Sequence, residues 1–382
     1  MRALLALLLV TPALAFGWGF DGHRKLASLM QDPLPSNSCL KAWLASKQTF
    51  NLQDSACDPD RWRYMSAGAN YDPDEWPRHY LEIDWIQPID SYPRRYEDVV
   101  AKVGATNAQR NGRVPWRVEE LYAALVEAFR AKDEAKILTQ VFIFSHYVTD
   151  SFSLLHDTKN FDPGGLHSRW ESDMLNSTAN LNGLAAAAKG YYGTSGKADP
   201  RNNIFDVVRV GNGVLPQLLA VDQTAYLPDG GYDLAVLYSG SKDLTARRWG
   251  DALTLLSSMV WSAWAEAGAP ELSGFSGSCS RAVPSVDPVL VGFPPPGGFT
   301  HPDAGSSSGT GGGSGASGGG APGGGAAASG GGADASGGGT ASSSGGGQGG
   351  GTTDAPSGCG CQSGPVAGLF AALALLARRR RS

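Results

Sequence analysis

Cysteine and histidine are scarce in this sequence, and both shortages restrict the kinds of site it can form. Only five of the 382 residues are cysteine and six are histidine. No two cysteines have the C-x-x-C spacing that thiolate zinc sites commonly use, so a zinc-finger type of site is not expected. In an oxidising compartment, Cys39 and Cys57 are instead expected to close a loop as a disulfide.

Long apolar runs are also missing. The run near the start extends only from Ala3 to Val10, which is too short for a helix that crosses a bilayer. It follows the basic Arg2 and precedes several small residues. This is the pattern of a secretory signal peptide, which we assign to residues 1–17, and the chain is therefore expected to be exported.

The other end of the sequence has an unusual composition. Residues 297–358 are almost entirely Gly, Ser, Ala and Thr, and such a segment cannot bury enough apolar surface to fold. Cys359, Cys361, a short apolar run over 364–377 and four arginines follow. This end resembles the C-terminal sorting tails of myxobacterial exported proteins. The resemblance implies a linker over 271–358, disordered from about 297, and a tail over 359–382 that surface-anchoring or tail-processing machinery recognises.

Positive charge is in the minority. The formal net charge is −5, and it becomes −10 when Arg2 and the arginines at 378–381 are left out. No basic patch is available to grip the backbone of duplex DNA. Binding to duplex DNA is therefore not expected.

The remaining residues, 18–270, are expected to form one multi-helical domain. Alternating strand patterns are scarce, and only residues 79–85 suggest an extended segment. We expect loops at 58–60 and around 70–77, and a helix break near Pro216. Apolar residues recur with helical spacing in four segments, at 118–128, 137–148, 204–219 and 244–267. The fold class is therefore predicted to be all-α.

Metal-ligating residue types gather in one short segment. Within 26 residues lie His146, Asp150, His156, His167 and Glu171, which include half of all histidines. His146 and Asp150 share a helix face, as do His167 and Glu171, because each pair is spaced i, i+4. One such pair is common on a solvated helix. A cluster of imidazoles and carboxylates is instead typical of a zinc site.

Three further motifs extend this cluster. They are Trp18-Gly19-Phe20-Asp21-Gly22-His23, Asp60 followed by Arg63, and His79-Tyr80. Together with the HxxxDxxxxxH and HxxxE patterns, they resemble the superfamily of zinc-dependent phospholipases C and single-strand-specific zinc nucleases. The resemblance covers nearly the whole domain.

The resemblance implies three zinc ions in an all-helical domain. It assigns Asp60, His79, His146 and Asp150 to one zinc; His156, His167 and Glu171 to a second; and the α-amino nitrogen and carbonyl oxygen of Trp18, with His23, to a third. Asp150 is expected to bridge the first and third ions, and Asp60 to act also as a base. Arg63 is placed to meet a phosphate oxygen, although a surface or ion-paired arginine is the alternative.

The sequence departs from both branches of the superfamily. The segment Gly164-Gly165-Leu166-His167 replaces a longer nuclease loop that contributes to holding a base, and Glu171 is more like the phospholipases. The WGFDGH motif and the spacing from His146 to His156 are more like the nucleases. We therefore expect an exported phosphodiesterase that acts on single-stranded nucleic acid, with phospholipids as the alternative substrate. A non-catalytic module stabilised by zinc is a further alternative.

The signal peptide could be cut after Ala15 or after Gly17, since both sites follow the small-x-small rule. Cleavage after Gly17 would free the α-amino group of Trp18 to bind zinc. Cleavage after Ala15 would leave Phe16 first and Trp18 as an apolar anchor.

Overall fold

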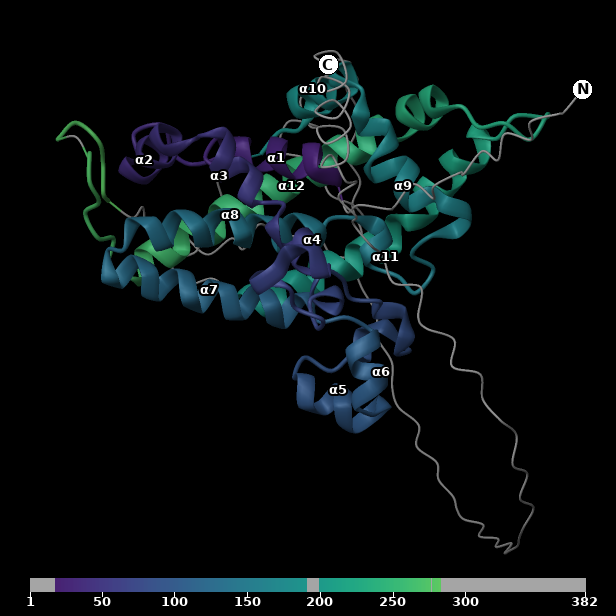
Figure 1. Ribbon diagram of the computed structural model, residues 1–382, viewed down its shortest axis with the longest axis horizontal. Coiled ribbons are helices and arrows are strands. Elements are labelled where there is room, and N and C mark those ends of the chain that lie inside the picture. Colours follow the sequence, from purple (N-terminus) through teal and green to yellow (C-terminus); the bar gives the residue numbers. More distant parts are fainter. Residues whose placement is uncertain (1–17, 191–198, 276, 283–382) are drawn as a thin grey trace, which may run out of the picture. The chain divides into compact units, whose positions relative to one another are not determined.

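The computed structural model describes residues 18–190, 199–275 and 277–282 (Figure 1). The expected signal peptide, the Gly/Ser-rich segment from 297 and the C-terminal tail lie outside these residues. In the described ranges the regular structure is helical, and β-pairing is limited to isolated bridges. The prediction of an all-α domain is confirmed.

Helices follow one another along the described chain. The α-helices are α1 Gly19–Leu29, α2 Cys39–Lys47, α3 Phe50–Ser55, α4 Asp58–Trp62, α5 Tyr96–Val103, α6 Ala105–Arg110, α7 Val114–Ala131, α8 Glu134–Asp150, α9 Leu166–Glu171, α10 Thr178–Ala187, α11 Pro200–Ala225 and α12 Leu234–Glu266. The short 3-10 helices are η1 Met65–Asn70, η2 Trp76–Arg78, η3 Ile83–Trp85, η4 Ile89–Ser91, η5 Leu154–His156, η6 Pro163–Gly165 and η7 Asp173–Asn176.

The long helices α7, α8, α11 and α12 form the centre of the domain. Helix α7 packs against the other three, and it lies beside α8 in Figure 1. Pro115 lies in its first turn, where proline suits the start of a helix. Large side chains such as Phe129, Phe144 and Trp264 fill the interior between these helices. This packing holds α8, which carries two of the expected ligands.

Helix α11 contradicts the predicted break at Pro216, because the helix continues to Ala225. Pro216 is exposed, so the carbonyl group that loses its hydrogen-bond partner can be hydrated. Leu215 and Leu218 are buried on either side of the proline and hold both halves in place. Among the described helices, α11 alone is long and apolar enough to cross a membrane by length and composition, a feature it shares with core helices of soluble proteins.

Two predictions for residues 58–85 are wrong. Residues 58–62 form α4 instead of a loop, and its early proline favours a helical first turn. The loop expected around 70–77 is largely present, because residues 71–75 lie outside any helix and connect η1 to η2. Residues 79–85 are not a strand: Leu81 forms an isolated bridge with Gly112, and η3 begins at Ile83. Their alternation instead reflects the burial of Leu81 and Ile83.

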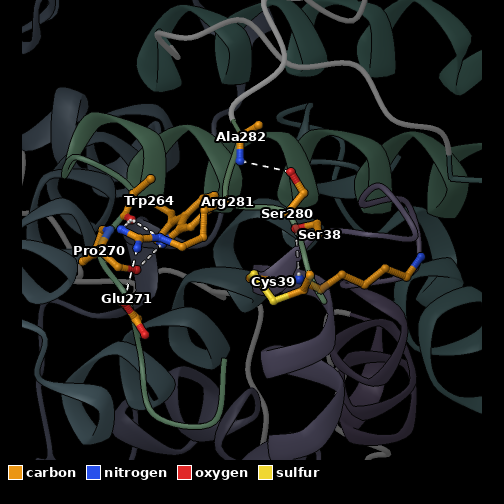
Figure 2. The surroundings of a disulfide bond; sticks show 11 residues. Ser38, Cys39, Trp264, Pro270, Glu271, Ser280, Arg281 and Ala282 are labelled. Carbon is orange, nitrogen blue, oxygen red and sulfur yellow. Dashed lines mark hydrogen bonds and ion pairs between the residues drawn. A yellow bond between two sulfur atoms is a disulfide. The ribbon is translucent and has the colours of Figure 1, made fainter. Parts of the chain in front are cut away.

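The predicted disulfide is also wrong. Cys39 pairs with Cys279, with their Cα atoms 4.9 Å apart (Figure 2). Cys57 is free and buried, and its thiol lies 3.4 Å from the carbonyl oxygen of Phe20. The prediction failed because two cysteines that are close in the sequence need not be close in the folded chain.

The segment around Cys279 is attached to the domain by its backbone as well. The backbone N–H of Cys39 donates to the carbonyl oxygen of Ser280 at 3.0 Å, and the N–H of Ser280 donates to that of Asn37 at 2.7 Å (Figure 2). Ordered contacts with the domain therefore continue past residue 270, into the segment expected to begin the linker.

Candidate metal centre

The fold brings together the eight expected ligands that bind through side chains. They come from α1, α4, α8, η5, α9 and the end of η2: His23, Asp60, His79, His146, Asp150, His156, His167 and Glu171. Each is at most 3% exposed. Among the described residues, three groups of them could hold metal ions: His23–Asp60–His146, His79–His146–Asp150 and His156–His167–Glu171.

Asp150 belongs to the second of these groups and also contacts His23 of the first. Its Oδ1 atom is 3.2 Å from Nε2 of His23. Its Oδ2 atom is 2.9 Å from Nδ1 of His79 and 3.1 Å from Nε2 of His146. The two oxygens of one carboxylate thus face different histidines, an arrangement suited to bridging two ions.

The third group lies around Glu171 on α9. Its Oε2 atom is 2.7 Å from Nε2 of His167 and 3.8 Å from Nε2 of His156. The hydroxyl of Ser153 donates to the other carboxylate oxygen. The two imidazoles face each other, with their Nε2 atoms 3.2 Å apart.

The outer nitrogens of the histidines determine which tautomer is present. In three rings Nδ1 faces a backbone carbonyl oxygen: His146 faces Ala56 at 2.7 Å, His156 faces His79 at 2.9 Å, and His167 faces Phe161 at 3.0 Å. A carbonyl oxygen can only accept, so each Nδ1 carries the proton. The inward Nε2 of a neutral ring is then free to bind a metal ion.

Nδ1 of His23 also carries the proton, but it donates to a hydroxyl oxygen instead of a backbone carbonyl. Its Nδ1 atom is 3.2 Å from Oγ1 of Thr149. That hydroxyl donates its own hydrogen to the carbonyl oxygen of His146 at 3.0 Å, so it accepts from His23. The Nε2 atom of His23 therefore also faces the cluster without a proton.

The interior of the site is crowded with acceptor atoms. Nε2 of His146 lies 2.9 Å from Nδ1 of His79. His23 Nε2, Asp60 Oδ2, Asp150 Oδ1 and Glu171 Oε2 are buried and have no hydrogen-bond partner in the part of the chain that the structure describes. Lone pairs directed at one another repel, and unpaired buried acceptors cost free energy. Cations bound among these atoms would remove both costs, so the residues fit a metal centre.

Two carboxylates of the cluster, those of Asp60 and Asp150, are held in their charged form. Burial raises the pKa of Asp60, but Arg63 and the neighbouring histidines outweigh burial and lower it. Burial also opposes ionisation of Asp150, yet His146 and His156 hold its pKa well below the usual range. Both carboxylates are therefore ready to bind cations.

The pKa values of the site's histidines are shifted in two directions. Burial lowers the pKa of His23, as does the nearby His146, and burial likewise lowers the pKa of His156. For His146, Asp150 and Asp60 outweigh burial and raise the pKa. A metal ion beside His146 would compete with that proton, because ligands bind in the unprotonated form.

Arg63 lies at the end of α4, beside the site. Its guanidinium group is buried, pairs with Asp60 Oδ1 and stacks 4.6 Å from the ring centroid of Trp76. It is thus an ion-paired arginine and not a surface one. The same position puts a fixed positive charge next to a ligand.

Trp18 is fully buried next to the site. Its indole N–H donates to the carbonyl oxygen of Thr149 at 2.9 Å, and its ring contacts Trp170 and Trp249 at centroid distances of 4.8 Å and 5.6 Å. Thr149 also accepts from His23, so Trp18 and His23 are held by one residue of α8.

Sequence reasoning missed one buried residue at the site. Glu75 is fully buried, and its Oε1 atom lies 3.4 Å from Nε2 of His79. Burial raises its pKa, but the nearby His79, a hydrogen bond from Tyr147 and the charge of Arg78 lower the pKa to about 2. The signal was present: Glu75 and His79 have the same i, i+4 spacing as His146 and Asp150.

Comparisons with known proteins do not place the chain in a family. No protein-family model matches it, and no curated protein matches it significantly.

Proposed function

We propose that this domain is a zinc-dependent phosphodiesterase with three metal ions. One observation carries the proposal: the Nε2 atoms of four histidines, whose Nδ1 atoms face hydrogen-bond acceptors, and the ionised oxygens of Asp60 and Asp150 converge inside a buried site. Nitrogen and carboxylate ligands suit zinc. We take the three ligand sets from the resemblance, with Asp150 shared between two ions. The group His156–His167–Glu171 coincides with one of these sets, whereas the structure also places His23 near Asp60 and His146.

The residues around the centre suit the hydrolysis of a phosphodiester. Bound zinc supplies Lewis-acid polarisation of a phosphate oxygen and lowers the pKa of water. Asp60 is ionised and its buried Oδ2 has no hydrogen-bond partner among the described residues, so it can accept a proton from an attacking water molecule. The guanidinium of Arg63, beside Asp60, is suited to hold a phosphate oxygen of the substrate.

Single-stranded nucleic acid is our first choice of substrate. The WGFDGH motif and the spacing of His146, Asp150 and His156 support it. Gly164 and Gly165 both have positive φ and lead directly into α9, so a tight turn stands in place of a base-holding loop. That turn, together with Glu171, supports phospholipid as the second candidate.

An exported location is part of the proposal. The Cys39–Cys279 disulfide supports it, because structural disulfides persist in oxidising compartments. Attachment to the cell surface through the C-terminal tail is proposed from the sequence pattern alone.

One panel of assays tests the function. Purified protein is incubated with an aryl phosphodiester, single-stranded DNA, RNA and phosphatidylcholine vesicles, before and after zinc removal by a chelator. We expect hydrolysis of the aryl ester and of single strands, loss of both on chelation, recovery with zinc, and a lower melting temperature without zinc. Cleavage of vesicles alone would select phospholipase C. Bound zinc without any hydrolysis would select the non-catalytic module.

A further inference from the structure

We propose that Glu75 is a positioning residue of the metal centre: its buried carboxylate faces Nε2 of His79, favours a proton on that atom and thereby leaves Nδ1 of the ring to the metal. The inference rests on the proposed metal centre and concerns how one of its ligands is oriented.

The contacts of Glu75 give it a defined place. Its Oε1 atom lies at an ion-pair distance of 3.4 Å from Nε2 of His79, an atom that forms no hydrogen bond among the described residues, and it accepts the hydroxyl hydrogen of Tyr147. Its Oε2 atom accepts from Nη1 of Arg78 at 2.7 Å. Glu75, His79 and Tyr147 are at most 1% exposed. The carboxylate is therefore held from both sides, in a place where water cannot replace it.

His79 differs from the other four histidines of the site. Their outer nitrogens face neutral oxygen atoms, three backbone carbonyls and one hydroxyl, and their inward atom is Nε2. The outer nitrogen of His79 faces a carboxylate, and its inward atom is Nδ1, 2.9 Å from Oδ2 of Asp150. For Nδ1 of this ring to bind a metal ion, the proton must lie on Nε2, which is the opposite tautomer to that of the other four histidines.

A charged partner does more than a neutral one. A carboxylate that accepts the outer N–H of an imidazole fixes the ring and makes its inward nitrogen a more basic ligand. Tyr147 follows His146 directly on α8, and its ring centroid is 5.3 Å from that of His79. Glu75 therefore ties the position of His79 to the helix that carries His146 and Asp150.

The test compares two variants that each remove one negative charge. Glu75→Gln keeps the size of the side chain but removes the charge. Asp72→Asn is the matched control, because Asp72 pairs with the same Arg78 Nη1 atom at 2.5 Å but forms no ion pair with a histidine in the described structure. Retained zinc is measured after dialysis against increasing concentrations of a competing chelator.

We expect Glu75→Gln to lose one zinc equivalent at an affinity about 10- to 100-fold lower than the unmodified protein. Asp72→Asn should retain zinc as the unmodified protein does. In ¹⁵N spectra, the His79 ring should carry its proton on Nε2 in the unmodified protein and in Asp72→Asn, and should lose this preference in Glu75→Gln. Equal zinc retention and an unchanged tautomer in Glu75→Gln would overturn the proposal.

A second variant covers the case in which Glu75→Gln does not fold. Glu75→Asp keeps the charge but withdraws it by one methylene group. A drop in zinc affinity of about tenfold supports the proposal, and affinity equal to that of the unmodified protein overturns it.

The two proposals can fail separately. A zinc-loaded unmodified protein that hydrolyses none of the four substrates contradicts the function and leaves the role of Glu75 to be decided by zinc retention. Unchanged retention in Glu75→Gln, with active unmodified protein, contradicts the role of Glu75 alone.

Discussion

Nε2 of His23 lies 3.2 Å from Oδ1 of Asp150, although the two residues belong to α1 and to the last turn of α8. The other oxygen of Asp150 faces His79 and His146. One carboxylate therefore joins ligands from three separate segments. Its loss should affect more than one metal ion.

The first prediction follows from that arrangement. Asp150→Ala should retain at least two fewer zinc ions than the unmodified protein and should lose phosphodiesterase activity, because a shared ligand serves two ions. Metal content measured by mass spectrometry checks this. Asp206→Ala is the control, since Asp206 lies in an exposed ion pair with Arg94. Full zinc occupancy in Asp150→Ala would contradict the bridging role.

The second prediction concerns the support beneath His156. Asp157 follows His156 in the chain, and its side chain lies against Gly211 on α11. A Cβ added at Gly211 would be 1.7 Å from Asp157 Oδ2. Gly211→Ala should therefore lower the free energy of unfolding by about 1–3 kcal/mol through overpacking. Denaturant unfolding measures this change.

Gly213 supplies the matched control on the same helix. An added Cβ at this exposed position would have no neighbour within 4 Å. Gly213→Ala should raise the free energy of unfolding by about 0.5–1 kcal/mol, because alanine favours the helix. Equal effects of the two substitutions would show that Asp157 does not constrain Gly211.

The third prediction concerns the disulfide. Cys279→Ser should lower the free energy of unfolding by about 2–4 kcal/mol, because the bond between Cys39 and Cys279 closes a long loop in the unfolded chain. The unmodified protein should lose a similar amount on reduction, and the variant should be insensitive to reductant. Cys57→Ala is the control and should keep that sensitivity. A reductant-insensitive unmodified protein would argue against the pairing.

The fourth prediction uses a carboxyl group away from the metal ligands. Burial raises the pKa of Glu82 to about 7, although a hydrogen bond from Trp85 opposes the shift. This pKa is higher in the folded chain than in the unfolded one, so the protonated Glu82 side chain adds to the free energy of unfolding. That stabilisation is complete below the unfolded pKa of about 4.3 and is lost as pH rises through 7. Glu82→Gln is neutral at every pH.

The variant should therefore gain stability relative to the unmodified protein as pH rises from 5.5 to 8. Melting temperatures of both proteins at the two pH values test the sign. A constant difference between them would show that Glu82 does not titrate in this range.

Local patterns revealed much of this domain, and long-range pairings remained hidden. Helical periodicity indicated α7, α8 and the second half of α12, and i, i+4 spacing placed His146 beside Asp150. Periodicity reports only which face of a segment is apolar. It could not show that Cys39 meets Cys279, or that packing would carry α11 through Pro216.

The metal ligands could be predicted from the sequence, but the groups that hydrogen-bond to them could not. Residue type and spacing indicated the side chains that converge in the site, but the partners of their outer nitrogens are set by the tertiary fold. Thr149 and the carbonyl oxygen of Ala56 have no sequence signal of their own. Glu75 had one, and it was missed because residues 70–77 were expected to form a loop, in which i, i+4 spacing does not imply a shared face.

The last prediction concerns where the mature chain begins. The indole of Trp18 donates to Thr149, which also accepts from His23, a ligand of the proposed third zinc. An α-amino group can bind zinc only when it is free, and its pKa of about 7.7–8.0 makes the neutral form available near pH 8. We therefore expect cleavage after Gly17, and N-terminal sequencing of the secreted protein should show Trp18 first.

A recombinant protein released with Trp18 at its N-terminus should bind about three zinc ions, whereas one carrying a single extra glycine should bind about two and lose most of its activity. The buried indole is the same in both, so the comparison isolates the amine. A secreted chain that starts at Phe16, or three zinc ions in the extended protein, would rule out the amine as a ligand and leave Trp18 as an apolar anchor.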